Sequence, residues 1–123
     1  MAQSSKNPAA GRLVAADEVE GTAVLDPNGS KIGTIERLML DKRSGEVAYA
    51  VLSFGGFLGV GDRHYPLPWP GLAYRPEDDA YIVDVTAEKL KDAPNWLPSE
   101  PSELADEAYC RQISVYWGYD YTP

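Results

Sequence analysis

Cysteine, histidine and long apolar runs are almost absent from this 123-residue chain, which has one cysteine and one histidine. A single cysteine, Cys110, excludes a disulfide within the chain, and with one histidine it excludes a structural zinc site built from those ligands. The longest apolar stretch, residues 48–52, is too short to span a bilayer, and residues 1–12 lack the apolar segment of a secretory signal. These absences predict a cytoplasmic domain with no metal and no cofactor.

Positive charge is scarce in the last part of the chain, and this scarcity sets the net charge of −8. Residues 1–75 hold 8 acidic and 8 basic side chains, whereas residues 76–123 hold 11 acidic and 3 basic ones. A protein that binds nucleic acid needs a basic face to displace the counterions of the phosphates, and anionic lipid likewise attracts basic segments. We therefore expect no nucleic-acid partner and no membrane insertion.

Short extended segments fill most of the chain between residues 13 and 85. Turn signals separate them, of which the Asn-Gly pair at residues 28–29 is the strongest because both residues tolerate positive φ. Strands of this length and spacing favour a small, closed, six-stranded antiparallel β-barrel over a two-sheet sandwich. The predicted strands are residues 19–25, 31–40, 46–54, 64–69, 72–75 and 80–85.

Glycine and proline positions refine the predicted strands. Gly33 permits a bend in the second strand. Pro66 and Pro68 leave only every second N–H able to pair, which predicts an edge strand bonded on one side.

The chain is predicted to become helical after the last strand. Thr86 has the hydroxyl of an N-cap, and residues 87–91 are expected to form a short helix. After a proline-containing linker, a second helix is expected at about residues 102–113, where apolar side chains recur at helical spacing. The predicted divisions are a disordered tail at residues 1–12, the barrel at 13–93, and a linker, helix and aromatic tail at 94–123.

His64 is the side chain whose pKa naturally lies near neutrality, so an acid–base or ligand-binding role would begin there, beside Asp62 and Arg63. No nucleophile accompanies this group, because no serine lies in a Gly-x-Ser-x-Gly setting and Cys110 is predicted to be an apolar packing residue on a helix. We therefore interpret His64 as a structural residue at the start of a strand.

Asp26, Asn28 and Ser30 have the alternating oxygen ligands that begin a calcium loop. Arg37 stands where the bidentate glutamate of such a loop belongs, so a hairpin turn is predicted instead.

The glycine-rich residues 55–61 lack the Lys-Ser/Thr that follows the glycines of a phosphate-binding loop. The same loop presents Phe57 and Leu58 between glycines, and apolar residues at a loop tip commonly contact another chain.

Taken in order, several of these motifs resemble the PRC-barrel domain family, in its stand-alone bacterial type, over about residues 13–93. The resemblance implies a small six-stranded barrel, a bias toward protein–protein contact and no catalytic residues. Relatives include the cytoplasmic domain of the photosynthetic reaction-centre H subunit and the C-terminal domain of a ribosome-maturation factor. The membrane helix of the first and the separate N-terminal domain of the second are not predicted here. The motifs are Asp26-Pro-Asn-Gly-Ser-Lys-Ile-Gly33, Leu38-Met-Leu-Asp41, Ser44-Gly-Glu-Val47, Tyr49-Ala-Val-Leu52, Gly55-Gly-Phe-Leu-Gly-Val-Gly61 and His64-Tyr-Pro-Leu-Pro-Trp69.

The sequence thus predicts a non-enzymatic adaptor or scaffold that associates with itself as a homodimer and binds an unidentified protein partner. The aromatic end of the chain either folds back over the barrel or is exposed to that partner. A small-ligand or enzymatic site at Asp62, Arg63 and His64 is the alternative, and a ribosome-assembly-type factor is the third reading. The candidate interface residues are Phe57, Leu58, Trp117, Tyr119 and Tyr121.

Overall fold

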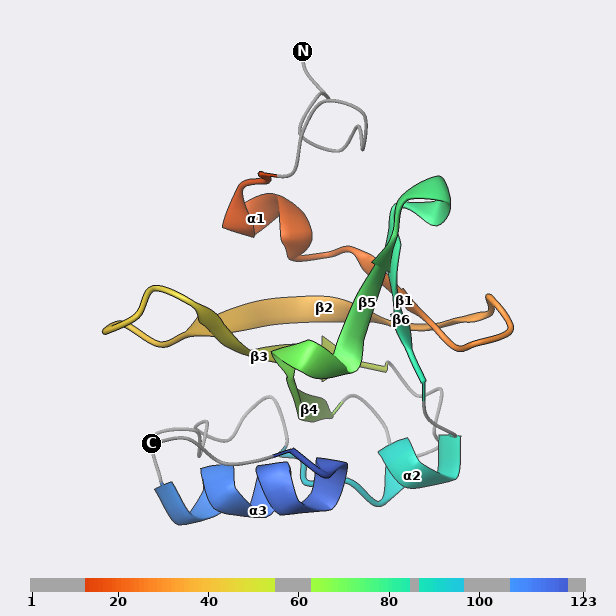
Figure 1. Cartoon of the computed structure of the whole chain (residues 1–123). Helices are drawn as coiled ribbons and strands as arrows, with labels where there is room; N and C mark the ends of the chain where they lie inside the picture. Colours follow the sequence, from red (N-terminus) through yellow and green to blue (C-terminus); the bar gives the residue numbers. More distant parts are fainter. Residues whose placement is uncertain (1–12, 55–62, 85–86, 97–106, 120–123) are drawn as a thin grey trace.

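Six strands form one curled, half-barrel sheet in the computed structural model, which describes residues 13–54, 63–84, 87–96 and 107–119 (Figure 1). The order of the strands across the sheet is β4-β3-β2-β1-β6-β5. Their bounds are β1 Ala23–Leu25, β2 Lys31–Leu40, β3 Val47–Ser53, β4 His64–Pro68, β5 Leu72–Arg75 and β6 Ala80–Val83. The helices are α1 Ala16–Val19, α2 Ala87–Lys91 and α3 Glu107–Trp117, with short 3-10 turns η3 at Trp69–Gly71 and η4 at Pro76–Asp78.

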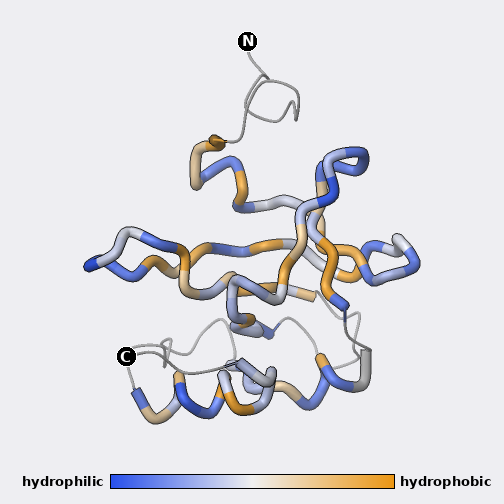
Figure 2. The backbone as a smooth tube through the Cα atoms, in the orientation of Figure 1, coloured by the Kyte–Doolittle hydropathy of each residue, from blue (hydrophilic) through white to orange (hydrophobic). Residues whose placement is uncertain are grey.

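Aspartate and glycine shape the two turns that set the register of β1, β2 and β3. Oδ1 of Asp26 accepts the backbone N–H of Asn28 and of Ser30, each at 2.9 Å, and Gly29 takes a positive φ of 88°. The β2–β3 turn repeats this arrangement, with Asp41 as the acceptor and Gly45 at φ 80°. Hydrophilic residues lie at these hairpin tips and hydrophobic ones along the strands (Figure 2).

The sheet is mixed and curls into a half-barrel, so the prediction of a mostly β, six-stranded fold is confirmed, whereas that of a closed, fully antiparallel barrel is not. β1 pairs with β6 in parallel, with Val24 opposite Tyr81, while the other pairs are antiparallel. The reason is the corner at η3, where the chain passes from β4 to β5 without reversing its direction along the sheet. The chain therefore makes one reversal fewer than a strictly alternating meander, and β6 returns parallel to β1. Among the described residues β4 and β5 are the two edges and do not pair with each other.

The predicted segments differ from the observed ones mainly at their ends. Val19 closes helix α1 rather than opening a strand, so the first strand is only Ala23–Leu25. Residues 87–91 form α2 as predicted, whereas Thr86 and residues 102–106 lie outside the described residues. The last helix continues to Trp117, beyond the predicted end at residue 113, because the aromatic residues there pack against the core.

Apolar side chains from the strands and from α2 fill the concave face of the sheet, and α3 packs on β4 (Figure 1). On α3, Ile113 is fully buried and Cys110 is buried, the latter as predicted. In Figure 1, α1 lies above the strands and α2 and α3 lie below them, and Val19 of α1 belongs to the same buried core as Leu90 of α2. The buried core comprises Val19, Val24, Ile32, Ile35, Ala50, Leu52, Phe54, Tyr65, Leu67, Val83, Leu90 and Ala93.

Candidate interaction surface

The β4 edge is the end of the sheet that cannot readily accept another strand. Pro66 and Pro68 have no N–H to donate, as the sequence predicted for an edge strand. The backbone of His64 is paired with Trp96, whose O accepts the N–H of His64 at 2.8 Å and whose N–H donates to the O of His64 at 3.0 Å. This edge is therefore partly covered by a later segment of the chain's own backbone.

Two residues of the alternative ligand site, Arg63 and His64, contact Asn95 and Trp96, respectively. The His64 side chain is buried, with 8% exposure, and its ring meets the Trp96 ring edge-to-face at 5.9 Å between centroids. Nε of Arg63 donates to Oδ1 of Asn95, and Nδ2 of Asn95 donates to the O of Ala93 at 2.8 Å. These contacts hold Asn95 and Trp96 against the start of β4. Asp62, the third residue of the alternative site, lies outside the described residues.

The described part of the aromatic tail lies on the chain's own domain. Tyr116 and Trp117 are half-buried against the core, and the Tyr116 hydroxyl donates to the O of Lys89 at 2.7 Å. The Lys89 ammonium lies 4.9 Å from the centroid of the Tyr116 ring and 5.7 Å from that of Trp117. Burial, followed by the negative charge of Asp92, raises the pKa of Tyr116.

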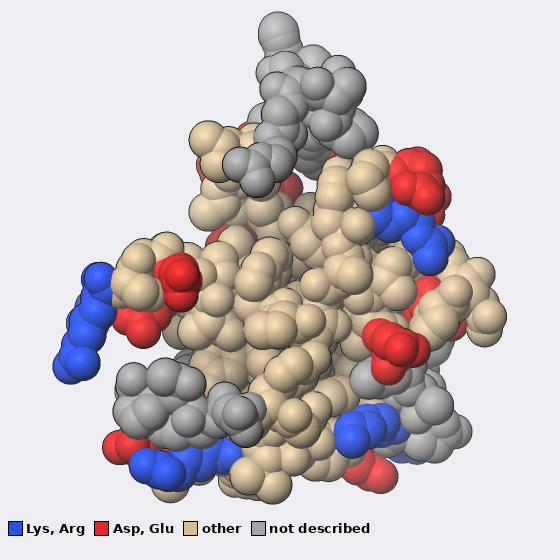
Figure 3. Space-filling view, in the orientation of Figure 1, with Lys and Arg blue, Asp and Glu red and all other residues tan. Residues whose placement is uncertain are grey.

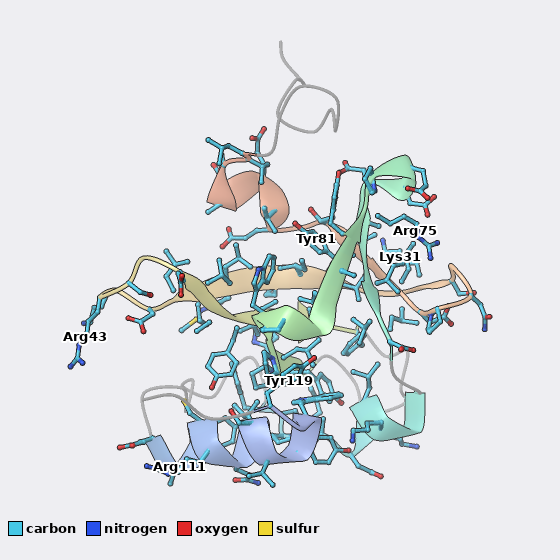
Figure 4. The ribbon with its side chains drawn as sticks, viewed as in Figure 1. Lys31, Arg43, Arg75, Tyr81, Arg111 and Tyr119 are labelled. Carbon is cyan, nitrogen blue, oxygen red and sulfur yellow. The ribbon has the colours of Figure 1, made fainter. Side chains whose placement is uncertain are left out.

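Tyr119 lies between α3 and the sheet (Figure 4). Its hydroxyl comes so close to Gly71 in η3 that a Cβ added there would be 3.2 Å away, and the side chain keeps 37% exposure. Of the other predicted interface residues, Phe57, Leu58 and Tyr121 lie outside the described residues.

An aromatic row next to the β5 edge is a feature that the sequence analysis did not single out. The ring centroids of Trp69 and Tyr81 are 5.5 Å apart, and those of Tyr81 and Tyr74 are 5.1 Å apart. Tyr74 and Tyr81 are directly opposite one another on β5 and β6, and Tyr74 is 41% exposed. The pairing of Tyr74 with Tyr81 could have been predicted from the turn at residues 76–79. Arg75 and Ala80 flank that turn and lie opposite each other, so the next residues along the two strands, Tyr74 and Tyr81, are also opposite each other.

Hydrogen bonding fixes the outer end of this row. The Tyr74 hydroxyl donates to Oδ1 of Asp79 at 2.7 Å, and this bond, followed by burial and the nearby charge, raises the pKa of Tyr74 to about 12. Burial, followed by the charge of Asp79, raises the pKa of Tyr81. Both rings are therefore neutral at physiological pH and present uncharged surface.

Charged side chains surround the face on which β5 and η3 lie. In Figure 3 the middle of this face holds uncharged side chains, and Lys, Arg, Asp and Glu lie toward its outline. Arg75 at the end of β5 is held by Asp78, with 3.2 Å between Nη1 and Oδ2. Arg43 extends from the tip of the β2–β3 hairpin, away from this face (Figure 4). An uncharged centre with a charged rim is the usual anatomy of a protein–protein interface.

Neither a metal-ligand cluster nor a membrane span is found in the part of the chain that the structure describes. No three His, Cys, Asp or Glu side chains gather there as ligands. The Oδ1 atom of Asp26, first residue of the calcium-like pattern, is used by the turn. None of the described helices combines the length and apolar character needed to cross a bilayer.

Comparison with known protein families shows to which family the domain that contains the sheet belongs. The model of the PRC-barrel domain matches residues 12–90, which contain all six strands and most of α2. No curated protein matches the chain. Trp96 and α3 lie beyond the matched residues, although both are packed on β4. The chain therefore belongs to the PRC-barrel domain family, and the resemblance found in its turn and strand motifs is confirmed.

Proposed function

We propose that this chain is a non-enzymatic protein-interaction module, an adaptor or scaffold, that associates with itself. The observation that carries the proposal is the uncharged face over β5 and η3, with charged side chains around it. At its centre an aromatic row lies beside an edge strand, and tyrosine and tryptophan are enriched among the residues that dominate binding energy.

The charge distribution supports a second copy as a partner on this face. Two copies that each carry −8 repel one another, so they can meet only where few acidic groups face each other. The side chains of β5 are Leu72, Ala73 and Tyr74, followed by Arg75, whose charge is already paired with Asp78. The same acidic balance supports a protein rather than a nucleic-acid partner.

Light scattering over a series of protein concentrations tests self-association. We expect the apparent mass to rise from 13.5 kDa toward twice that value as the concentration increases. Raising the salt concentration should leave the association intact or strengthen it, because salt screens the repulsion between two acidic molecules. A mass of 13.5 kDa at every concentration would contradict self-association.

A further inference from the structure

We propose that two copies of this chain join through β5, which pairs with β5 of the second copy in antiparallel orientation about a two-fold axis at Tyr74. This inference rests on the proposed self-association and names the surface and the register through which it occurs. Of the two edges of the described sheet, β4 is interrupted by prolines and covered by Trp96, whereas β5 contains no proline.

The backbone of Tyr74 supplies the unpaired groups on this edge. In an antiparallel strand the N–H and C=O of one residue point to the same side, and successive residues alternate between the two sides. The N–H of Leu72 donates to the O of Trp69 in η3 and not to β6. By alternation, Ala73 and Arg75 bond to β6, while the N–H and C=O of Tyr74 point away from it. Among the described residues β5 pairs with β6 only, so these two groups have no backbone partner.

The unpaired backbone N–H and C=O of Tyr74 determine the register of the proposed β5–β5 pair. Placing Tyr74 opposite its own copy lets the two residues exchange two N–H···O bonds without using the N–H of Leu72. Ala73 then faces Arg75 of the second copy, so no two like charges meet across the pair. The side chains of Tyr74 from the two copies lie on one face, which joins the two aromatic rows into one.

The uncharged surroundings extend the contact beyond the strand. A pair of four-residue strands is small for a permanent dimer, and the uncharged side chains over η3 provide further area. We expect a dimer whose population depends on concentration.

Substitution of Tyr74 separates the role of its backbone from that of its side chain. Tyr74→Pro removes the outward N–H, and proline is tolerated on an edge strand whose N–H points to solvent. Tyr74→Thr removes the ring but keeps the N–H. Both variants lack the Tyr74 hydroxyl that donates to Asp79, so the loss of this hydrogen bond cannot account for a difference between them.

We expect the dissociation constant of the dimer to rise at least about tenfold in Tyr74→Pro relative to Tyr74→Thr, because two intermolecular hydrogen bonds are lost. Light scattering measures the association, and circular dichroism checks that each variant is folded. Equal dissociation constants in the two variants would overturn the proposed pairing.

Cross-linking tests the register independently of the proline variant. One chain carries Ala73→Cys and a second carries Arg75→Cys, both with Cys110→Ala so that no other thiol is present. Residues opposite each other in a non-hydrogen-bonded antiparallel pair have Cα atoms about 4.5 Å apart, within reach of a disulfide.

We expect a disulfide-linked heterodimer when the two chains are mixed and oxidised. The control replaces Arg75→Cys with Val115→Cys, on an 80% exposed position of α3. No linked heterodimer, or equal linking in the control, would overturn the register. If wild-type protein is dimeric but these results are negative, the self-association stands and only the β5 interface fails.

Discussion

Gly33 is the residue that lets β2 approach the end of β3 closely. A Cβ at this position would lie 2.4 Å from the backbone O of Ser53 and 2.5 Å from Cδ1 of Phe54, both closer than atoms can pack. The sequence pattern around Gly33 predicts a bend in the strand, whereas the structure gives a steric reason for the glycine that involves a neighbouring strand. A contact between residues twenty positions apart is not visible in a local pattern.

Gly33→Ala is therefore expected to destabilise the fold by about 3 kcal/mol, at the upper end of the range for overpacking. Gly71→Ala is the matched control, because the one tight neighbour of its Cβ would be the hydroxyl end of Tyr119, a side chain that can move, while Leu67 would lie at ordinary van der Waals distance. We expect the control to change stability by less than about 1 kcal/mol. Urea unfolding of both variants measures the difference, and equal stability would contradict the steric account.

Asp41 holds the β2–β3 turn through its charge. Its Oδ1 accepts the backbone N–H of Arg43 at 2.8 Å and of Ser44 at 3.3 Å, and these bonds lower its pKa from the ordinary 3.8. Because the folded pKa is depressed, the stabilisation is complete above the unfolded value and is lost as the pH falls through the folded value.

We expect the Asp41 carboxyl to titrate below pH 3.8 when it is followed by carbon NMR. Asp41→Asn keeps an oxygen acceptor but cannot ionise, so the variant should lack this part of the acid dependence of stability. Titration at or above the ordinary value would show that the turn does not favour the ionised form.

At the level of elements, local turn chemistry could be read from the sequence and nonlocal pairing could not. The Asn28-Gly29 turn, the span Lys31–Leu40 and the proline-containing edge strand were predicted correctly, because neighbouring residues determine them. The parallel pairing of β1 with β6 depends on the corner at η3, whose direction no local pattern encodes. The same limit hid the contact between Trp69 and Tyr81, which forms only through that corner.

α3 is an element beyond the family match that nevertheless packs on the family sheet. Ile113 on its inner side is fully buried, while Val115 on the other side is 80% exposed. Trp96 packs on His64, and the Tyr116 hydroxyl donates to the O of Lys89 in α2. We infer that residues 95–96 and α3 belong to the same folding unit as the sheet.

Ile113→Ala should then lower the free energy of unfolding by about 2–5 kcal/mol, as expected for a large apolar side chain removed from a core. Val115→Ala, two residues along the same helix, should change it by no more than about 0.5 kcal/mol. Thermal unfolding by fluorescence compares the two. A small effect of Ile113→Ala would mean that α3 contributes little to the stability of the sheet.

At the scale of the whole molecule, the two edges of the sheet differ in what they offer to a partner. The β4 end is closed by prolines and Trp96, and α3 packs on β4. The β5 end presents a strand and an aromatic row on an uncharged face. An acidic protein that associates with itself is expected to use the second end, because few charges oppose contact there.

Backbone hydrogen exchange at Tyr74, compared at low and high protein concentration, tests the self-association through β5 most directly. The Trp96 amide is the internal reference, because it donates to the O of His64 within the same chain. We predict that exchange at Tyr74 slows as the concentration rises, while exchange at Trp96 stays constant. Equal exchange at Tyr74 under both conditions, in samples whose mass shows a dimer, would contradict the β5 interface.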